Sequence, residues 1–256
     1  MTVPPRSEFP PISGAADADL WEEHATWWID GFTDGADPEY EEQILPLAAA
    51  ELAGFSRVLD IGCGDGQISR LLAATGSLVV GIDPTWNQIR VAGERGGRAA
   101  YVRSGAAELP FADASVDAAV ACLVFEHIDD VYGAIDEVAR VVRPGGRFSF
   151  FLNHPLLQTP GSGWISDYTL DPPESYWRIG PYLVEQDSVE QVERGVFIRF
   201  LHRPLSTYVN ALSEAGLVLE RMVEPAPPDG FLDRAAEYSA ASAIPRLLYL
   251  RLRRTA

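Results

Sequence analysis

The stretch Val58-Leu-Asp-Ile-Gly-Cys-Gly-Asp-Gly-Gln67 predicts the end of a strand, a glycine-rich loop and the start of a helix. Because glycine has no Cβ atom, such a loop lets a ligand approach the backbone, at the carboxyl edge where open α/β sheets bind ligands. The dinucleotide fingerprint would place its third glycine at the position of Gln67. Asp60, shortly before the first glycine, suits a ligand with a cationic amino group better than a pyrophosphate. The loop therefore disfavours a nicotinamide oxidoreductase.

The middle of the chain repeats a strand–helix pattern. Short apolar runs rich in β-branched or aromatic residues occupy 58–61, 78–82, 100–103, 118–123 and 147–152. Helical patterns lie between several of them, and the one from Phe125 to Val142 ends at Arg143-Pro-Gly-Gly146. This alternation predicts a parallel sheet covered by helices on both faces.

Both flanks of this middle part differ from it. Acidic residues accumulate from Asp17 to Glu51 without an arginine, among several aromatic side chains. The preferred interpretation is a solvated helical surface, and the alternative is a segment that covers a ligand. Residues 153–203 are rich in Pro, Gly and aromatic residues, enough to form a small core of their own. Within them, 183–189 and 196–201 are expected to pair as a hairpin.

The last part of the chain predicts a helix at 205–215 and strands at 217–223 and 246–253. The expected division is an N-terminal arm and helical cap (1–54), a ligand-binding core (55–152), an aromatic insertion (153–203) and the rest of the core sheet (204–256). The arm proper is expected over residues 1–19.

Composition excludes several classes of protein. The 256 residues carry a net charge of −17, with arginine as their only basic residue type apart from histidine, so nucleic acid and anionic membranes are disfavoured as partners. No apolar run approaches the roughly 18 residues of a membrane span, and Met1–Phe9 lacks the pattern of an export signal. Two cysteines fit a reducing compartment. We expect a soluble cytoplasmic protein, monomeric or homodimeric.

Further motifs follow the glycine loop. The second strand ends in Asp83, an acid that is placed to bind both hydroxyls of a ribose. Its alternative role is to cap the helix that opens at Thr85, and the two roles are compatible. Pro84 offers a flat apolar face for a purine. The third strand is followed by Ser104-Gly-Ala-Ala-Glu-Leu-Pro-Phe111, and the fourth strand and its exit are Val116-Asp-Ala-Ala-Val-Ala-Cys-Leu-Val-Phe-Glu-His127.

In these motifs the chain resembles the class I S-adenosylmethionine-dependent methyltransferases, nearest to the ubiquinone/menaquinone-biosynthesis type and its small-molecule relatives. The resemblance covers residues 55–152, as five motifs in the right order. It implies a Rossmann-like α/β fold with a seven-stranded, mostly parallel sheet whose last strand is antiparallel. It also implies S-adenosylmethionine as the cofactor. Cys63 and Cys122 lack metal-ligand spacing, so no metal is expected.

The resemblance also assigns cofactor contacts. The loop residues would hold the methionine part, Asp83 the ribose, and the turn after the third strand the adenine edge. Many relatives have Asp where Gly105 stands, so adenine recognition is expected from backbone groups. The residues expected to bind the cofactor are Asp60, Gly62, Cys63, Gly64, Gln67, Asp83, Pro84, Gln88, Gly105, Ala106, Ala107 and Leu123.

The expected reaction is methyl transfer to a small organic acceptor, with oxygen favoured as the accepting atom. The resemblance implies that the aromatic insertion at 153–203 is a substrate lid, a role compatible with a small core of its own. His154 and His202 are the preferred candidates for a base because they flank this lid. His127 is a third candidate, and its alternative role is a helix-start residue bonded to the backbone. Phe125-Glu-His127 also resembles lipid cyclopropane synthases. A non-catalytic cofactor-binding protein and an aminopropyl transferase are further alternatives.

Overall fold

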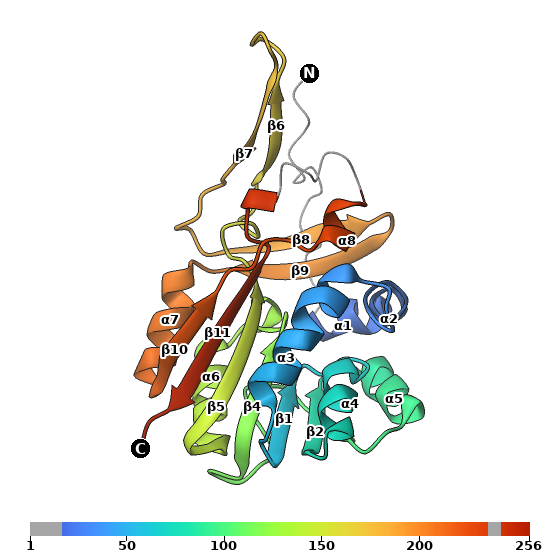
Figure 1. Cartoon of the computed structure of the whole chain (residues 1–256), viewed down its shortest axis with the longest axis vertical. Helices are drawn as coiled ribbons and strands as arrows, with labels where there is room; N and C mark the ends of the chain where they lie inside the picture. The colour runs from blue at the N-terminus through green and yellow to red at the C-terminus, as the bar shows by residue number, and fades with distance from the viewer. Residues whose placement is uncertain (1–16, 235–241) are drawn as a thin grey trace.

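The computed structural model describes residues 17–234 and 242–256, built around a seven-stranded sheet (Figure 1). Its strands are β1 (Arg57–Ile61), β2 (Leu78–Asp83), β3 (Ala100–Arg103), β4 (Val116–Cys122), β5 (Val142–Asn153), β10 (Leu217–Val223) and β11 (Leu247–Arg254). They lie in the order β10-β11-β5-β4-β1-β2-β3, and β11 alone among them runs antiparallel to its neighbours β5 and β10. The predicted Rossmann-like sheet with an antiparallel last strand is therefore confirmed.

Helices follow or precede these strands. They are α1 (Asp17–Glu23), α2 (Ala25–Phe32), α3 (Leu45–Leu52), α4 (Gln67–Ala74), α5 (Trp86–Arg95), α6 (Val131–Val141), α7 (Leu205–Glu214) and α8 (Asp229–Leu232), with a π-helical turn η1 (Tyr40–Ile44) and a 3-10 turn η2 (Phe125–His127). The single helical pattern expected from Phe125 to Val142 is thus divided in two. The division falls at Asp130, whose Oδ1 accepts the backbone N–H of Gly133 at 2.8 Å and caps α6.

The sheet separates two apolar clusters. Every residue of β4 is buried, as a strand covered on both faces requires. Side chains of β1 point alternately to the two faces. Leu59 and Ile61 pack with α6 and α7, whereas Val58 packs with α3 and α4.

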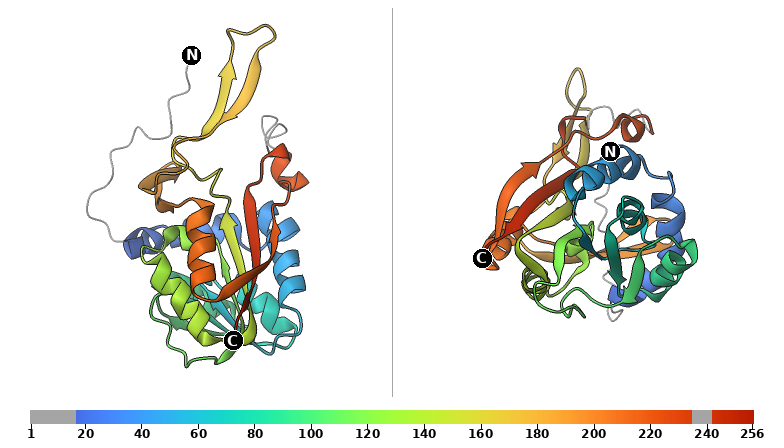
Figure 2. Two further views of the ribbon diagram at one scale, coloured as in Figure 1. Left: turned by 90° about the vertical axis from the view of Figure 1, so that its left-hand side faces the viewer. Right: turned by 60° about the horizontal axis from the view of Figure 1, so that its bottom comes forward.

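Two hairpins lie between β5 and α7: β6 (Gly163–Asp167) with β7 (Glu174–Arg178), and β8 (Gln186–Glu193) with β9 (Val196–His202). The expected strand at 196–201 is confirmed, but its partner does not span 183–189. Glu193 pairs with Val196, which leaves Arg194 and Gly195 as a two-residue turn with Gly195 at φ +82°. Such a turn sets the register, so the partner strand must run back from Glu193. The β6–β7 hairpin, which the sequence did not predict, projects from the body (Figure 2).

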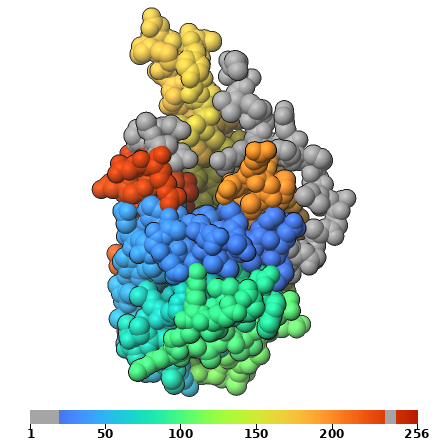
Figure 3. Space-filling view, turned by 90° about the vertical axis from the view of Figure 1, so that its right-hand side faces the viewer, coloured from blue at the N-terminus to red at the C-terminus, as the bar shows by residue number. Residues whose placement is uncertain are grey.

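The N-terminal helices and the β8–β9 hairpin lie side by side at the carboxyl ends of the sheet strands. Figure 3 shows this N-terminal segment, in blue, between α4 and α5 below and the hairpin above. Trp27 Nε1 on α2 donates to Glu193 Oε2 on β8 at 2.8 Å. Most of the arm expected at 1–19 lies outside the described residues. Within the described ranges, no helix is long and apolar enough to cross a membrane.

Candidate active site

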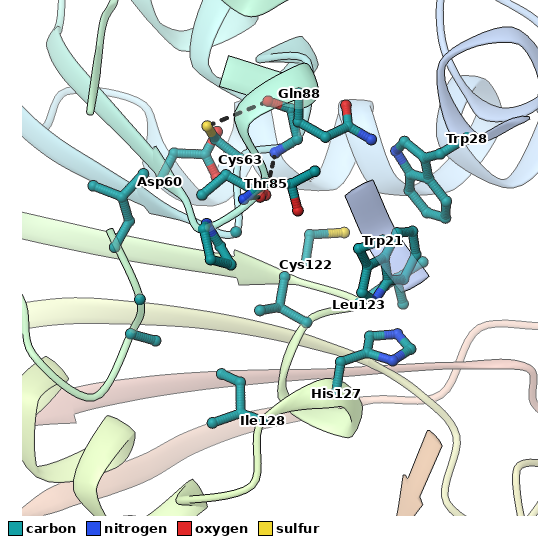
Figure 4. A pocket seen from close by; sticks show the side chains of 18 of the residues that line it. Trp21, Trp28, Asp60, Cys63, Thr85, Gln88, Cys122, Leu123, His127 and Ile128 are labelled. Atoms are coloured by element: carbon teal, nitrogen blue, oxygen red, sulfur yellow. Dashed lines mark hydrogen bonds between the residues drawn. The ribbon is translucent and has the colours of Figure 1, made fainter. Parts of the chain in front are cut away.

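A cavity of about 350 Å³ lies where β1, β2 and β4 end (Figure 4). Every residue predicted to bind the cofactor lines it, namely Asp60, Gly62, Cys63, Gly64, Gln67, Asp83, Pro84, Gln88, Gly105, Ala106, Ala107 and Leu123. These residues meet because the carboxyl ends of parallel strands share one edge of the sheet. The N-terminal segment adds Trp21, Trp28 and Tyr40 to the lining.

The loop between β1 and α4 contains glycine where a side chain does not fit. Gly62 has φ +66°, and a Cβ atom there would overlap the side chain of Val124. Gly66 has φ +86°, and its Cβ atom would overlap the ring of Tyr101. The backbone conformation of the loop and its packing against Val124 and Tyr101 therefore require glycine at these two positions, and Gly62 also lines the cavity.

Asp60 is a buried carboxylate at the end of β1. Its exposed fraction is 2%, and Ser69 Oγ donates to its Oδ2 at 2.6 Å. Burial raises the pKa of Asp60 to about 6, because the charged form loses its hydration. A cationic group in the cavity would stabilise the ionised carboxylate, so Asp60 is suited to a ligand that carries an ammonium group.

Asp83 joins the glycine loop to the start of α5. Its Oδ2 accepts from Gly64 N at 3.0 Å and its Oδ1 from Thr85 N at 2.8 Å. Burial raises the pKa of this carboxyl, and the two backbone hydrogen bonds oppose that rise. Each oxygen retains acceptor capacity toward the cavity, where ribose hydroxyls could donate.

Asp83 contributes one hydrogen bond at the start of α5, from Thr85 N, and a second carboxylate accepts from the residues that follow. The carboxylate of Glu22, on α1, accepts from Trp86 N at 2.7 Å and from Asn87 N at 3.1 Å. These are the first backbone N–H groups of α5, so its N-terminus is capped by a residue distant in sequence.

The turn after β3 and the end of β4 border a further part of the cavity. Ser104, Gly105 and Ala106 line it beyond β3, and the space a Cβ atom on Gly105 would occupy has no atom within 4 Å. Leu123, at the end of β4, has φ +56°, a left-handed conformation that is strained for a residue with a side chain. Such strain concentrates at functional sites.

Of the three candidate histidines, His127 alone lines the cavity. Its Nδ1 lies 2.7 Å from the carbonyl oxygen of Arg199 on β9. A carbonyl only accepts, so Nδ1 carries the hydrogen and Nε2 holds a lone pair. Burial lowers the pKa of His127 and favours this neutral form. The rings of Trp21 and Phe200 pack on it at centroid distances of 5.0 and 4.8 Å.

His154 and His202 are buried outside the cavity lining. His154 Nδ1 accepts from Leu156 N at 3.1 Å, and Nε2 lies 2.7 Å from Glu224 Oε1, so both nitrogens are engaged. His202 Nε2 lies 2.8 Å from the carbonyl oxygen of Tyr182, and its Nδ1 is buried without a hydrogen bond. These contacts do not support the base role that the sequence favoured for the two histidines, which stays a prediction.

Sequence reasoning missed the residues that hold His127 in place. The buried guanidinium of Arg203 donates to the carbonyl oxygens of Phe125, Ile128 and Asp129 at 3.2, 2.8 and 3.0 Å. Glu126, which precedes His127, accepts a hydrogen bond at 2.8 Å from Nδ2 of Asn153, the last residue of β5. The segment after β4 is thus held from both ends of the lid insertion.

The acidic N-terminal segment, whose preferred interpretation was a solvated surface, has exposed acidic residues together with aromatic residues that face the cavity. Trp21 packs edge-on against Trp28 at a centroid distance of 5.6 Å, and both line the cavity. The alternative, that this segment covers a ligand site, fits the structure. Aromatic side chains among the acidic residues were the available signal. No group of three or more potential metal ligands occurs among the described residues.

Comparisons with known proteins agree with this geometry. The family described as "Methyltransferase domain" matches residues 59–150. The chain is 33% identical over 135 residues to the O-methyltransferase resE of Aspergillus sclerotiorum. It is 31% identical over 170 residues to the 27-O-demethylrifamycin SV methyltransferase of Amycolatopsis mediterranei. These matches cover 49% and 59% of this chain and 51% and 60% of the relatives, so the chain spans about half the length of the curated relatives it matches.

A solved structure extends the likeness beyond the core. The crystal structure of an S-adenosylmethionine-dependent methyltransferase from Mesorhizobium loti matches with a TM-score of 0.69 and 28% identity, over 82% of this chain and 96% of that one. The sheet order, the glycine loop and the acid after β2 agree with this relationship. Residues 59–150 thus match the methyltransferase domain family, and the fold is that of the class I S-adenosylmethionine-dependent methyltransferases.

Proposed function

We propose that the protein transfers a methyl group from S-adenosylmethionine to a small organic molecule, with a hydroxyl oxygen as the favoured acceptor. The observation that carries this proposal is the single cavity that joins the predicted cofactor residues to the neutral imidazole of His127. Two relatives are named for O-methylation, which supports oxygen as the acceptor.

The residues of the cavity fit the cofactor in chemical type. The backbone of the glycine loop and the Asp60 carboxylate suit the methionine part, Asp83 suits the ribose hydroxyls, and Pro84 with the Gly105 turn suits the adenine. The buried Oε1 of Gln88 also lacks a donor among the described residues, as expected of a site that a polar ligand completes.

His127 is the proposed base. The bound cofactor supplies an electrophilic methyl group on sulfur, and a hydroxyl acceptor must lose its proton as it attacks. Nε2 of His127 takes that proton, while the Nδ1–H bond to the Arg199 carbonyl holds the ring and its tautomer. The walls of the cavity align the two reactants, an effect worth roughly 7–11 kcal/mol in favourable cases.

We further propose that the N-terminal segment and the 153–203 insertion form the cover of the site. Trp21 and Trp28 line the cavity from one side, and β9 holds His127 from the other. The net charge of −17 supports a protein that works without nucleic acid or anionic membranes. We propose a cytoplasmic monomer or homodimer.

Incubation with methyl-labelled S-adenosylmethionine and a metabolite extract, followed by mass spectrometry, tests the proposal. We expect labelled small molecules whose formation is lost in Asp83→Ala and His127→Gln. Tight binding of S-adenosylhomocysteine without transfer to any extract would instead support the non-catalytic alternative.

A further inference from the structure

The side of the cavity beside His127 is built from aromatic rings. Trp21, on α1, packs edge-on against the imidazole of His127 at a centroid distance of 5.0 Å, and both side chains line the cavity. Figure 4 shows Trp21 and His127 together on one side of the cavity, apart from the carboxylate of Asp60 on the other. An acceptor within reach of His127 therefore meets the indole of Trp21 as well.

Contacts on both sides of Trp21 hold this wall in place. Glu22, the next residue of α1, accepts from the first backbone N–H groups of α5 at 2.7 and 3.1 Å. Trp28, on α2, meets Trp21 edge-on at a centroid distance of 5.6 Å and also lines the cavity. Aromatic rings pack favourably edge-on or offset on one another. A flat aromatic acceptor therefore gains more from this wall than a saturated molecule of the same size.

The charges of the lining disfavour an anionic acceptor. No arginine occurs among the described residues that line the cavity, and the chain has no lysine. The acidic residues of the lining are Asp60, Asp65, Asp83, Asp129 and Asp130. A carboxylate or phosphate on the acceptor would lose its hydration there without gaining a cationic side chain as a partner. The lining therefore selects for an acceptor that carries no negative charge.

His127 also restricts the type of hydroxyl group. Burial lowers the pKa of its imidazole, which makes it a weaker base than an exposed histidine. A weak base takes a proton most readily from an acidic hydroxyl. An aromatic hydroxyl such as that of tyrosine ionises at a pKa of about 10, whereas an aliphatic hydroxyl is far less acidic. The base and the aromatic wall thus favour the same kind of acceptor.

We propose that the acceptor is an uncharged aromatic hydroxyl compound, whose ring lies against Trp21 and whose hydroxyl group lies beside His127 Nε2. This inference rests on the proposed function and names its substrate class. The acceptor oxygen forms the new bond to the methyl carbon as the sulfur–methyl bond breaks. The electron pair of that bond stays on sulfur, and Nε2 takes the hydroxyl proton. Trp21 is then a specificity-determining residue of the cap.

Three probes with one bicyclic skeleton test the inference in the presence of methyl-labelled S-adenosylmethionine. They are 2-naphthol, 6-hydroxy-2-naphthoate, which adds a carboxylate, and decahydro-2-naphthol, whose rings are saturated. We expect kcat/KM for 2-naphthol to exceed that for each of the other two by about tenfold or more. Trp21→Leu should raise KM for 2-naphthol by about tenfold and leave S-adenosylhomocysteine affinity within about threefold. Trp86→Leu, at a half-exposed indole on α5 outside the cavity lining, is the matched control and should change neither.

Equal turnover of 2-naphthol and either of the other probes would overturn the inference, and so would an unchanged KM for 2-naphthol in Trp21→Leu. If Trp21→Leu does not fold, the three probes on the wild-type protein decide the question. A wild-type protein that binds S-adenosylhomocysteine but methylates none of the probes would overturn the inference alone. Failure to bind S-adenosylhomocysteine would contradict the proposed function itself, which distinguishes the two failures.

Discussion

Asp83 connects cofactor binding to the geometry of the glycine loop, because one carboxylate holds Gly64 N and faces the cavity. Asp83→Ala removes hydrogen bonds to a charged group, each worth roughly 1.5–3 kcal/mol, part of which water restores. We expect S-adenosylhomocysteine affinity to fall by about 10- to 100-fold by calorimetry. Asp167→Asn, on the projecting hairpin, serves as the control. Unchanged affinity in Asp83→Ala would mean that Asp83 only shapes the loop.

Asp60 should stabilise the protein less at neutral pH than in mild acid. Its pKa is raised from 3.8 to about 6, so the folded state holds this proton more tightly than the unfolded chain. Its contribution is complete below pH 3.8 and is lost as the pH rises to about 6, by about 2 to 3 kcal/mol in all. In urea unfolding without ligand, Asp60→Asn should therefore be more stable than wild type at pH 7.5. The difference in the free energy of unfolding should be smaller at pH 4.5. Equal differences at both pH values would contradict this.

His127 is expected to lower the barrier to proton removal. His127→Gln should reduce kcat by about 100-fold or more and leave S-adenosylhomocysteine affinity within about threefold. Because burial lowers its pKa, kcat/KM should rise with pH to a plateau, with a midpoint below that of an exposed histidine. His154→Gln and His202→Gln are the comparisons. If His154→Gln and His202→Gln lost turnover while His127→Gln kept it, the base would be one of the two histidines that the sequence favoured.

At the scale of elements, Arg203 joins the end of the lid to the segment that carries His127. Arg203 is 7% exposed, and its guanidinium donates to three backbone carbonyls, which Arg203→Leu would leave without this donor. We expect the free energy of unfolding to fall by about 3 kcal/mol in urea, together with kcat. Arg178→Leu, at an exposed position of β7, should change it by less than about 0.5 kcal/mol. A stable and fully active Arg203→Leu variant would show that packing alone holds this segment.

The helices and strands that a local sequence pattern determines could be predicted. The strands of the core and the glycine loop follow from apolar runs and from residue types such as Gly62 that the backbone demands. The β8 register depended on the Arg194–Gly195 turn, and the strand pattern alone did not locate it. The roles of the histidines depended on long-range contacts, such as that of His154 with Glu224, which no local pattern reveals.

At the scale of the whole molecule, a cavity assembled by the core strands is completed by segments outside the matched methyltransferase domain. The N-terminal helices supply Trp21 and Trp28, and β9 orients His127. The match to the methyltransferase domain at residues 59–150 therefore includes the cofactor side of the cavity but not the segments that cover it. The acceptor is expected to depend on the cover.

The central claim is that this cavity binds S-adenosylmethionine and its product rather than a dinucleotide. Calorimetric titration of the wild-type protein with S-adenosylhomocysteine and, separately, with NADH tests it most directly. Gln67 stands in place of the third glycine, and the buried carboxylates Asp60 and Asp83 face the cavity, so a pyrophosphate is disfavoured. The account predicts saturable binding of S-adenosylhomocysteine at one site per chain and far weaker binding of NADH. Comparable affinity for NADH, or no binding of S-adenosylhomocysteine, would contradict it.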